Sequence, residues 1–243
     1  MVLFLRAAII LITKQLNGAM KKYAVIVAGG SGLRMGTALP KQFLLIHNKP
    51  ILWYTLHTFL KSYKEIQIIL VLPIDYYETG ITICEEFNPI NPIQAIVGGD
   101  TRFHSVQKGL SLVCEESIVF IHDAVRCLIS PSLIHHCFEE ALKFGSAIPC
   151  VDSKDSIRLI HATGHKSIKR SEIKLVQTPQ TFQSCILLPA YRTCYQEQFT
   201  DDASVVEASD CEVHLVDGEP NNIKITTPLD LAIAEELLDP PQF

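Results

Sequence analysis

Short apolar runs alternate along the chain with longer stretches in which apolar residues recur every three or four positions. The short runs predict strands over residues 24–27, 66–72, 93–97, 118–121, 146–151 and 212–216. The longer stretches predict helices over residues 50–62, 76–86, 103–113, 131–142 and 184–198, a short helix after Asp202 and a last helix from Thr227. Strands that alternate with helices are typical of a mainly parallel sheet. The pattern therefore predicts an α/β, Rossmann-like fold with helices on both faces of the sheet.

Two of the predicted helices begin with capping signals. Ser130 followed by Pro131 is typical of an N-cap and a first helical residue. Thr227 followed by Asp230 has the spacing of a capping box. Both signals fix where a helix begins.

The alternation stops over residues 152–175, which are polar and rich in lysine and arginine. Thr163 and Gly164 give a turn signal near the middle of this segment. We predict that it forms a β-hairpin arm, which projects from a single domain of residues 21–238. Residues 239–243 are expected to be a frayed tail.

Residues 1–20 precede the first strand and do not fit the fold pattern. Their apolar run, residues 7–12, follows Arg6 and is too short to span a bilayer. Met20 leads directly into the first strand and could be the working start of the chain. We therefore expect residues 1–20 to be an unstructured or non-native extension, and no membrane partner.

Charge is distributed unevenly over the 243 residues. The net charge is −5, but residues 1–64 contain no Asp or Glu and hold nine of the 21 lysines and arginines. A basic N-terminal part in an acidic protein suits a small anionic ligand. Binding of duplex nucleic acid would need a basic domain instead, so no nucleic-acid partner is expected.

The eight cysteines lie mostly in apolar runs, and none forms a CxxC pair. The chain is large enough to fold without disulfides, and paired zinc-ligand spacing is missing. Free thiols indicate a reducing compartment, and we expect a cytoplasmic protein.

A glycine-rich loop follows the first predicted strand and reads AGGSGLRMG, from Ala28 to Gly36, before Pro40, Lys41 and Gln42. Backbone N–H groups in such a loop, together with the charges of Arg34 and Lys41, are suited to holding phosphate. A Walker A loop is excluded because Gly36 is not followed by Lys and Ser or Thr.

A dinucleotide-binding loop is the other alternative, because Gly30, Gly32 and Gly36 have a similar spacing. It needs a helix directly after the glycines and an acidic residue about 20 positions later. Pro40 would interrupt that helix, and the first acidic residue of the chain is Glu65. The sequence therefore lacks the helix and the acidic residue that a dinucleotide-binding loop requires.

Six further motifs follow in order. They are Gly98-Gly99-Asp100 with Arg102 and Ser105, then HDAVR at 122–126, DSIR at 155–158, QTPQ at 177–180, TDDAS at 200–204 and NIKIT at 222–226. With the glycine-rich loop, which resembles that of sugar-phosphate nucleotidylyltransferases, they resemble the 2-C-methyl-D-erythritol 4-phosphate cytidylyltransferase family. The resemblance covers about residues 22–238 and implies a fold of the nucleotide-diphospho-sugar transferase type.

The resemblance implies transfer of CMP from CTP to 2-C-methyl-D-erythritol 4-phosphate in isoprenoid precursor biosynthesis, with pyrophosphate released. It assigns catalysis to Arg34, Lys41, Arg170 and Lys224. It assigns nucleotide binding to Ala28, Gly29, Gly30, Ser31, Gly32, Gly98, Gly99, Asp100, Ser105, Asp123 and Ala124. Substrate binding falls to Arg126, Ser156, Arg170, Thr178, Thr200 and Lys224, and Mg²⁺ or another divalent cation to Asp123. The family's arm crosses to a second subunit, which implies a homodimer.

Four positions depart from the usual family pattern, namely Val125, Cys127, Ser156 and Arg158. Ser156 keeps a hydroxyl group and Arg158 keeps a positive charge, so activity is expected. Two rival interpretations are a ribitol-5-phosphate cytidylyltransferase and a non-catalytic nucleotide-binding regulator. A dehydrogenase is a third, which NAD binding would test. His122 has no partner at metal-ligand spacing, so we expect a core histidine, or one that supports the site from behind, rather than a metal ligand.

Overall fold

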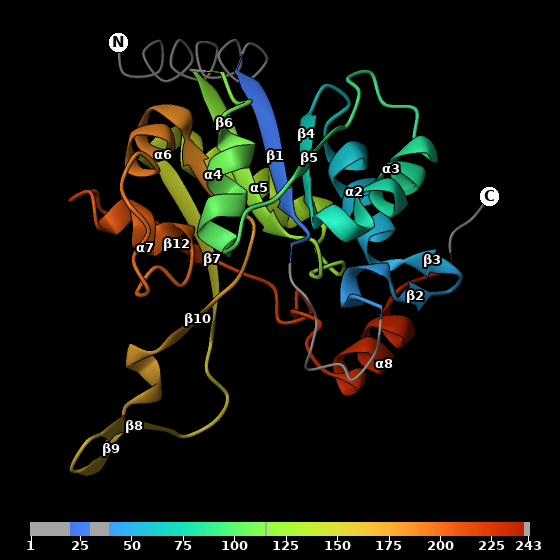
Figure 1. The fold of residues 1–243 in the computed structure, drawn as a ribbon. Coiled ribbons are helices and arrows are strands. Elements are labelled where there is room, and N and C mark those ends of the chain that lie inside the picture. The colour runs from blue at the N-terminus through green and yellow to red at the C-terminus, as the bar shows by residue number, and fades with distance from the viewer. Residues whose placement is uncertain (1–19, 30–38, 115, 241–243) are drawn as a thin grey trace, which may run out of the picture.

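The structure is a computed structural model that describes residues 20–29, 39–114 and 116–240. Predictions for Gly30, Ser31, Gly32, Arg34 and Gly36, for residues 1–19 and for the last three residues lie outside the described residues. A sheet of eight strands forms the centre of the described part (Figure 1).

The strands of this sheet run in the order β10-β7-β11-β6-β1-β4-β5, and β12 pairs with β7. Their bounds are β1 (Lys21–Val27), β4 (Gln67–Leu72), β5 (Gln94–Val97), β6 (Ser117–Asp123), β7 (Ser146–Asp152), β10 (Lys174–Val176), β11 (Gln180–Gln183) and β12 (Leu215–Asp217). The four neighbours β6, β1, β4 and β5 are mutually parallel. Their carboxyl ends therefore meet at one edge of the sheet, which we call the carboxyl edge.

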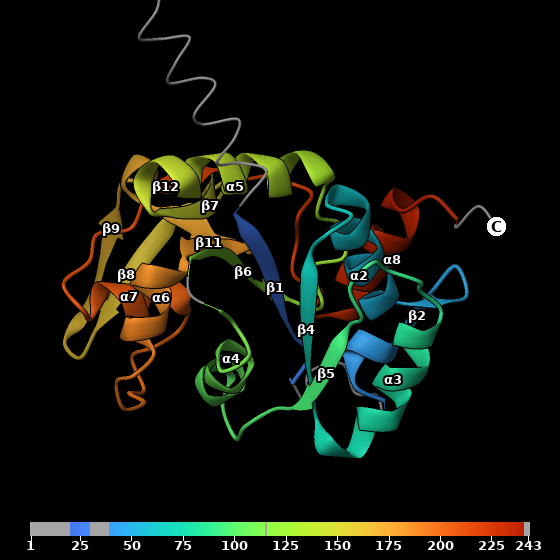
Figure 2. The ribbon, with the colours of Figure 1, turned by 90° about the horizontal axis from the view of Figure 1, so that it is seen from above.

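Helices cover both faces of the sheet, as predicted (Figure 2). One face packs against α2 (Ile51–Ser62), α3 (Tyr77–Glu85) and α5 (Pro131–Phe144), and the other against α4 (Arg102–Leu110), α6 (Ser184–Ala190) and α7 (Asp202–Glu207). Alternate residues of β6 supply the two cores: Phe120 packs in the first and Val119 in the second. This period of two explains why the central strands are apolar throughout.

A third, smaller core lies beneath α8 (Pro228–Leu237), where Ile225 and Ala234 pack against Val125 after β6. The capping signals at the start of α5 and α8 are confirmed. Ser130 Oγ accepts a hydrogen bond from Leu133 N at 3.0 Å. Thr227 and Asp230 form a reciprocal capping box.

The helix predicted over residues 184–198 is wrong in its second half, because α6 ends at Ala190. After Pro189 the chain turns, with Arg192 N donating to Pro189 O at 3.1 Å. Residues 192–198 are mostly exposed, so they have no apolar face whose burial would stabilise a helix. The strand predicted over residues 212–216 begins later, at Leu215.

The strands β10 and β11 were not predicted, and neither was the short pair β2 (Leu45–Ile46) and β3 (Lys49–Pro50). β11 is antiparallel to both β6 and β7 and is only four residues long. A run this short contains too few positions for a periodic pattern.

The predicted hairpin is present, with β8 (Ile157–His161) antiparallel to β9 (Gly164–Ile168), followed by the 3-10 turn Arg170–Glu172. Figure 1 shows the arm between β7 and β10 extending away from the sheet. The single domain of residues 21–238 remains a prediction.

Candidate functional site

Three loops meet at the carboxyl edge, because each is anchored to a neighbouring strand. The anchoring bonds are Ala28 N to Val71 O (2.8 Å), Gly98 N to Leu72 O (2.8 Å) and Ala124 N to Val27 O (3.0 Å). The predicted residues Gly29, Gly98 and Asp123 therefore belong to one region of the fold. Ligands of open α/β sheets bind at this edge.

The loop after β5 is fastened to α4 by Ser105. Its buried hydroxyl accepts a hydrogen bond from Gly99 N at 3.1 Å and lies 3.3 Å from Gly99 O. A Cβ on Gly98 would lie 2.8 Å from Ser105 Oγ, so this close approach needs glycine. Lys108 Nζ donates to Gly98 O at 2.8 Å, while Asp100 is exposed.

The charged centre of the site is Asp123, the last residue of β6. Lys224 Nζ lies 2.8 Å from its Oδ2 and Arg102 Nε lies 3.2 Å from its Oδ1. Arg126 Nε lies 3.8 Å from Oδ2. Asp123, Arg102, Arg126 and Lys224 are called the Asp123 cluster below.

Electrostatics keeps Asp123 ionised despite its burial. Burial alone would raise the pKa of this carboxyl, but Arg102 and Lys224, with Arg126, outweigh it and hold the pKa well below its usual range. The cluster combines three cations with one carboxylate. Asp202, which binds Arg102 at 2.7 Å, offsets one more of these charges, and the positive charge that remains can accept a further anion.

Backbone anchoring explains how Lys224 reaches Asp123 from a distant part of the sequence. Ile225 N donates to Val125 O at 3.0 Å, and Arg126 Nη1 donates to Asn222 O at 2.8 Å. Asn222 Nδ2 donates to Thr178 O at 2.8 Å. The loop before α8 is thereby joined to the loop after β6.

Thr178 and His122 support Asp123 through a short series of polar contacts. Asp123 N donates to Thr178 Oγ1 at 3.1 Å, and Thr178 Oγ1 lies 3.0 Å from His122 Nδ1. The other ring nitrogen, Nε2, lies 3.3 Å from the carbonyl of Arg126, which can only accept. Burial lowers the pKa of His122 to about 3, so the ring is neutral. The prediction of a core histidine is confirmed.

Lys41 begins the 3-10 turn Lys41–Phe43 and is buried. The next residue, Gln42, donates from Nε2 to Ala28 O at 2.5 Å, which joins this turn to the loop after β1. Lys41 is therefore not a solvated surface lysine.

Within the part of the chain that the structure describes, three predicted substrate residues make no hydrogen bond or ion pair with the Asp123 cluster. Ser156 and Arg170 are exposed on the arm, where Arg170 Nη1 donates to Lys154 O at 2.8 Å. Thr200 is exposed before Asp201, the N-cap of α7.

The sequence analysis gave no role to Asp202 and did not identify Tyr191. Asp202 receives two hydrogen bonds from the Arg102 guanidinium group, at 3.0 and 2.7 Å, and one from the Tyr191 hydroxyl at 2.6 Å. The sequence signal that could have identified Asp202 is its place in the TDDAS motif. Tyr191 directly follows the end of α6 and has no such sequence signal.

Among the described residues, no group of three or more His, Cys, Asp and Glu side chains could hold a metal ion. All eight cysteines fall within the described ranges and are free. No helix in the described part is long and apolar enough to cross a membrane.

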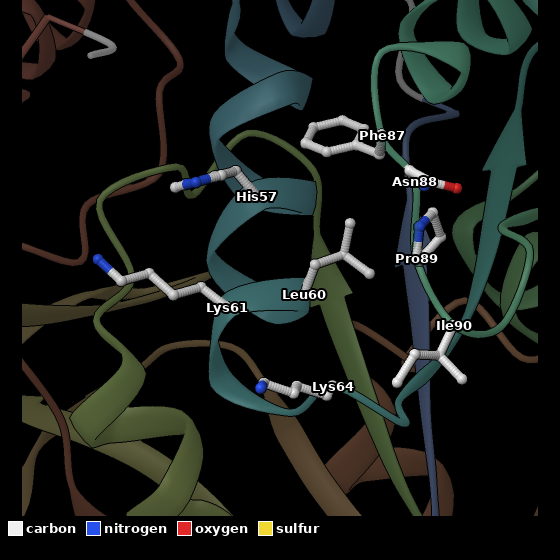
Figure 3. A pocket seen from close by; sticks show the side chains of 8 residues that line it. All are labelled: His57, Leu60, Lys61, Lys64, Phe87, Asn88, Pro89 and Ile90. Carbon is white, nitrogen blue, oxygen red and sulfur yellow. The ribbon is translucent and has the colours of Figure 1, made fainter. Parts of the chain in front are cut away.

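A cavity of about 390 Å³ lies elsewhere, between the end of α2 and the loop after α3 (Figure 3). It is lined by His57, Leu60, Lys61, Lys64, Phe87, Asn88, Pro89 and Ile90. α2 leads into the start of β4 and this loop into the start of β5, so the cavity lies at the opposite edge from Asp123. It is not part of the candidate site.

A mainly parallel sheet and a cationic cluster around a buried carboxylate suit a nucleotidyltransferase, and the comparisons with known proteins place the chain in that class. It belongs to the 2-C-methyl-D-erythritol 4-phosphate cytidylyltransferase family, whose model matches residues 22–240.

Individual relatives agree with this family. The 2-C-methyl-D-erythritol 4-phosphate cytidylyltransferases of Bacteroides thetaiotaomicron and Bacteroides fragilis are 46% and 47% identical, and each alignment covers 90% of this chain and 100% of the relative. The crystal structure of 4-diphosphocytidyl-2C-methyl-D-erythritol synthase from Anaerococcus prevotii aligns with a TM-score of 0.77 and 30% identity, over 89% of this chain and 97% of the other.

Proposed function

We propose that this chain transfers CMP from CTP to 2-C-methyl-D-erythritol 4-phosphate, which gives 4-diphosphocytidyl-2-C-methyl-D-erythritol and pyrophosphate. The observation that carries the proposal is the Asp123 cluster, which lies beside the loop Gly98–Ser105 at the carboxyl edge. An anionic acceptor and an anionic nucleotide both need cations there, and the similar relatives are named for this activity.

In the proposed reaction, a phosphate oxygen of the acceptor forms a bond to the α-phosphorus of CTP. The bond from that phosphorus to the bridging oxygen breaks, and pyrophosphate leaves with the electron pair. A phosphomonoester is largely a dianion at pH 7, because its second pKa is about 6, so no general base is needed. The protein has to neutralise charge and align the reactants.

Different cations of the site are proposed to act on CTP and on the acceptor phosphate. Arg34 and Lys41 have the proposed role of stabilising charge at the α-phosphorus. Lys224 leaves Asp123 for the acceptor phosphate, which its half-exposed side chain allows. Arg126, Thr178 and Thr200 are proposed to help to position the acceptor.

Nucleotide recognition is proposed for the loops after β1, β5 and β6. The proposed role of Ala28, Gly29, Gly30, Ser31 and Gly32 is to bind the phosphates through backbone N–H groups. Gly98, Gly99, Asp100 and Ser105 recognise cytosine, because rejection of a wrong base depends on polar groups that it leaves unpaired. Asp123 and Ala124 contact the ribose.

Asp123 would hold Mg²⁺ together with the phosphates of CTP. One carboxylate is enough, since Mg²⁺ is commonly bound by one or two carboxylates, substrate phosphates and waters. The buried carboxylate at the carboxyl edge fits this donor set. When bound, the cation neutralises phosphate charge.

The proposed function is tested by pyrophosphate release from CTP in Mg²⁺ buffer, with 2-C-methyl-D-erythritol 4-phosphate or ribitol 5-phosphate as acceptor. Release with the first acceptor alone, and its loss in Lys41→Ala, supports the proposal. Release with ribitol 5-phosphate alone would assign the rival substrate. CTP binding without release would support a non-catalytic regulator.

Ser105→Ala is expected to weaken CTP binding by about 10-fold, because the N–H of Gly99 loses its side-chain acceptor. Ser111→Ala is the matched control, since its exposed hydroxyl bonds only Lys108 O, just beyond the same helix. Isothermal titration with CTP measures both. Equal affinities of the two variants would contradict a role for Ser105 in the base loop.

A homodimer formed through the arm is also proposed. Ile160 on β8 is 72% exposed, so the face of the hairpin that carries it can be buried by another surface. A second subunit would cover this face and bring Ser156 and Arg170 to the site that the single chain leaves incomplete.

The eight free thiols support the cytoplasm as the compartment.

Ile160→Asp is expected to shift the protein from dimer to monomer, because a carboxylate would be buried in the proposed interface. Light scattering coupled to size exclusion measures the molar mass. The control is Ile74→Asp, whose side chain is 67% exposed and lies away from the arm. An unchanged dimer in Ile160→Asp would contradict this interface.

A further inference from the structure

Arg102 connects two carboxylates that come from different parts of the chain. It is the first residue of α4, directly after the loop Gly98–Thr101. Its two terminal nitrogens bind Asp202 at 3.0 and 2.7 Å, and only its Nε faces Asp123, at 3.2 Å. The planar guanidinium group therefore has its fork on Asp202 and its side on Asp123.

Asp202 is fully buried in this arrangement. Its side chain is 0% exposed, and the Tyr191 hydroxyl donates to its Oδ1 at 2.6 Å. Burial and the charge of Asp202 hold the pKa of Tyr191 well above its ordinary value, so the hydroxyl keeps its proton. Arg102 and Tyr191 together satisfy a carboxylate that would otherwise be too costly to bury.

The fork on Asp202 limits what Arg102 can do at Asp123. A guanidinium group that is free to rotate prefers to grip a carboxylate with two parallel hydrogen bonds. Such a grip on Asp123 would occupy both of its oxygens. Held as it is, Arg102 contacts Oδ1, and Oδ2 is shared by Lys224 and, farther away, Arg126.

We propose that Asp202, supported by Tyr191, is a positioning residue for CTP binding: it orients Arg102 so that Asp123 is fixed through Oδ1 while Oδ2 stays available to the nucleotide. Lys224 can then leave Oδ2 for a phosphate without releasing Asp123. Arg102 also ties the start of α4, and with it the loop Gly98–Thr101, to Asp123. The inference rests on the proposed function, because Asp123 must face CTP.

Two variants weaken, to different extents, the contacts that run from Tyr191 through Asp202 to Arg102. Asp202→Asn removes the charge that holds the guanidinium fork, and loss of such supporting partners commonly costs about 10- to 100-fold in affinity. Tyr191→Phe removes one hydrogen bond and is expected to cost about 3- to 10-fold. Tyr54→Phe is the control, because it also loses a buried hydroxyl, which there bonds Ile46 O at 2.8 Å.

CTP titration in Mg²⁺ buffer without acceptor gives Kd, and steady-state rates give kcat and the KM of each substrate. The expected result is a raised Kd and KM for CTP in both variants, a KM for the acceptor within about twofold and no change in Tyr54→Phe. A purely structural role would lower the melting temperature and the active fraction but leave the Kd for CTP of the folded protein unchanged, which would overturn the proposal.

CTP titration of Asp123→Asn in parallel distinguishes failure of the positioning role of Asp202 from failure of the contact between Asp123 and CTP. Weaker CTP binding in Asp123→Asn with unchanged binding in Asp202→Asn and Tyr191→Phe would overturn the positioning role and keep the proposed function. Unchanged CTP binding in Asp123→Asn would overturn both the ribose contact and the positioning role built on it.

Discussion

Asp123→Asn is expected to lower kcat/KM for pyrophosphate release by about 10²- to 10³-fold, which is the scale for loss of one preorganised charged group. Asparagine keeps the size of the side chain but removes the negative charge that faces Lys224 and Arg102 at 2.8 and 3.2 Å. The site then has no carboxylate for a divalent cation, and Lys224 loses the partner that holds it in place.

The measurement is the initial rate of pyrophosphate release at several CTP concentrations, with circular dichroism to show that the variant is folded. Asp210→Asn is the control, because Asp210 is exposed beyond α7 and its backbone φ of 57° suits asparagine. Retention of more than about a tenth of the wild-type rate in Asp123→Asn would contradict the central role of this carboxylate.

Phe120→Ala is expected to lower the free energy of unfolding by about 3–5 kcal/mol, the range for large-to-small changes in a core. Phe120 is 0% exposed on β6, between β1 and β11. Its ring packs at 5.9 Å from Phe59 and 6.5 Å from Phe138, so alanine would leave a cavity between the sheet, α2 and α5.

Phe144→Ala is the matched control, since Phe144 ends α5 with 57% of its surface exposed and stacks only on His214. Its expected cost is less than about 1 kcal/mol. Urea unfolding at matched protein concentrations measures both variants, because association would link stability to concentration. Similar losses for the two phenylalanines would mean that the core at β6 can collapse around the deletion.

Much of the site could be predicted because its residues follow strands that the hydrophobic pattern already located. Gly98 and Asp123 were expected at strand ends and Ser105 on the helix that follows, and parallel pairing brings the two strand ends to one edge. Lys41 follows the first loop closely, so chain length alone keeps it near. The hairpin was predictable for the opposite reason, since residues 152–175 are polar, rich in lysine and arginine, and contain the turn signal Thr163-Gly164.

Other features could not be predicted, because they depend on contacts between segments about 100 residues apart. The bond from Arg102 to Asp202 and the approach of Lys224 to Asp123 exist only once α7 and the loop before α8 have packed. The end of α6 at Ala190 is a similar case, because the exposed residues after it have no core to cover.

The sequence by itself determined the alternation of strands and helices, the capped starts of α5 and α8, and the order of the motifs, because each depends on residues close together in the chain. Only the tertiary structure decided which charges meet at Asp123 and that Asp202 holds the far side of Arg102. Electrostatic pairing acts over a few ångströms in space and leaves no periodic trace along the chain.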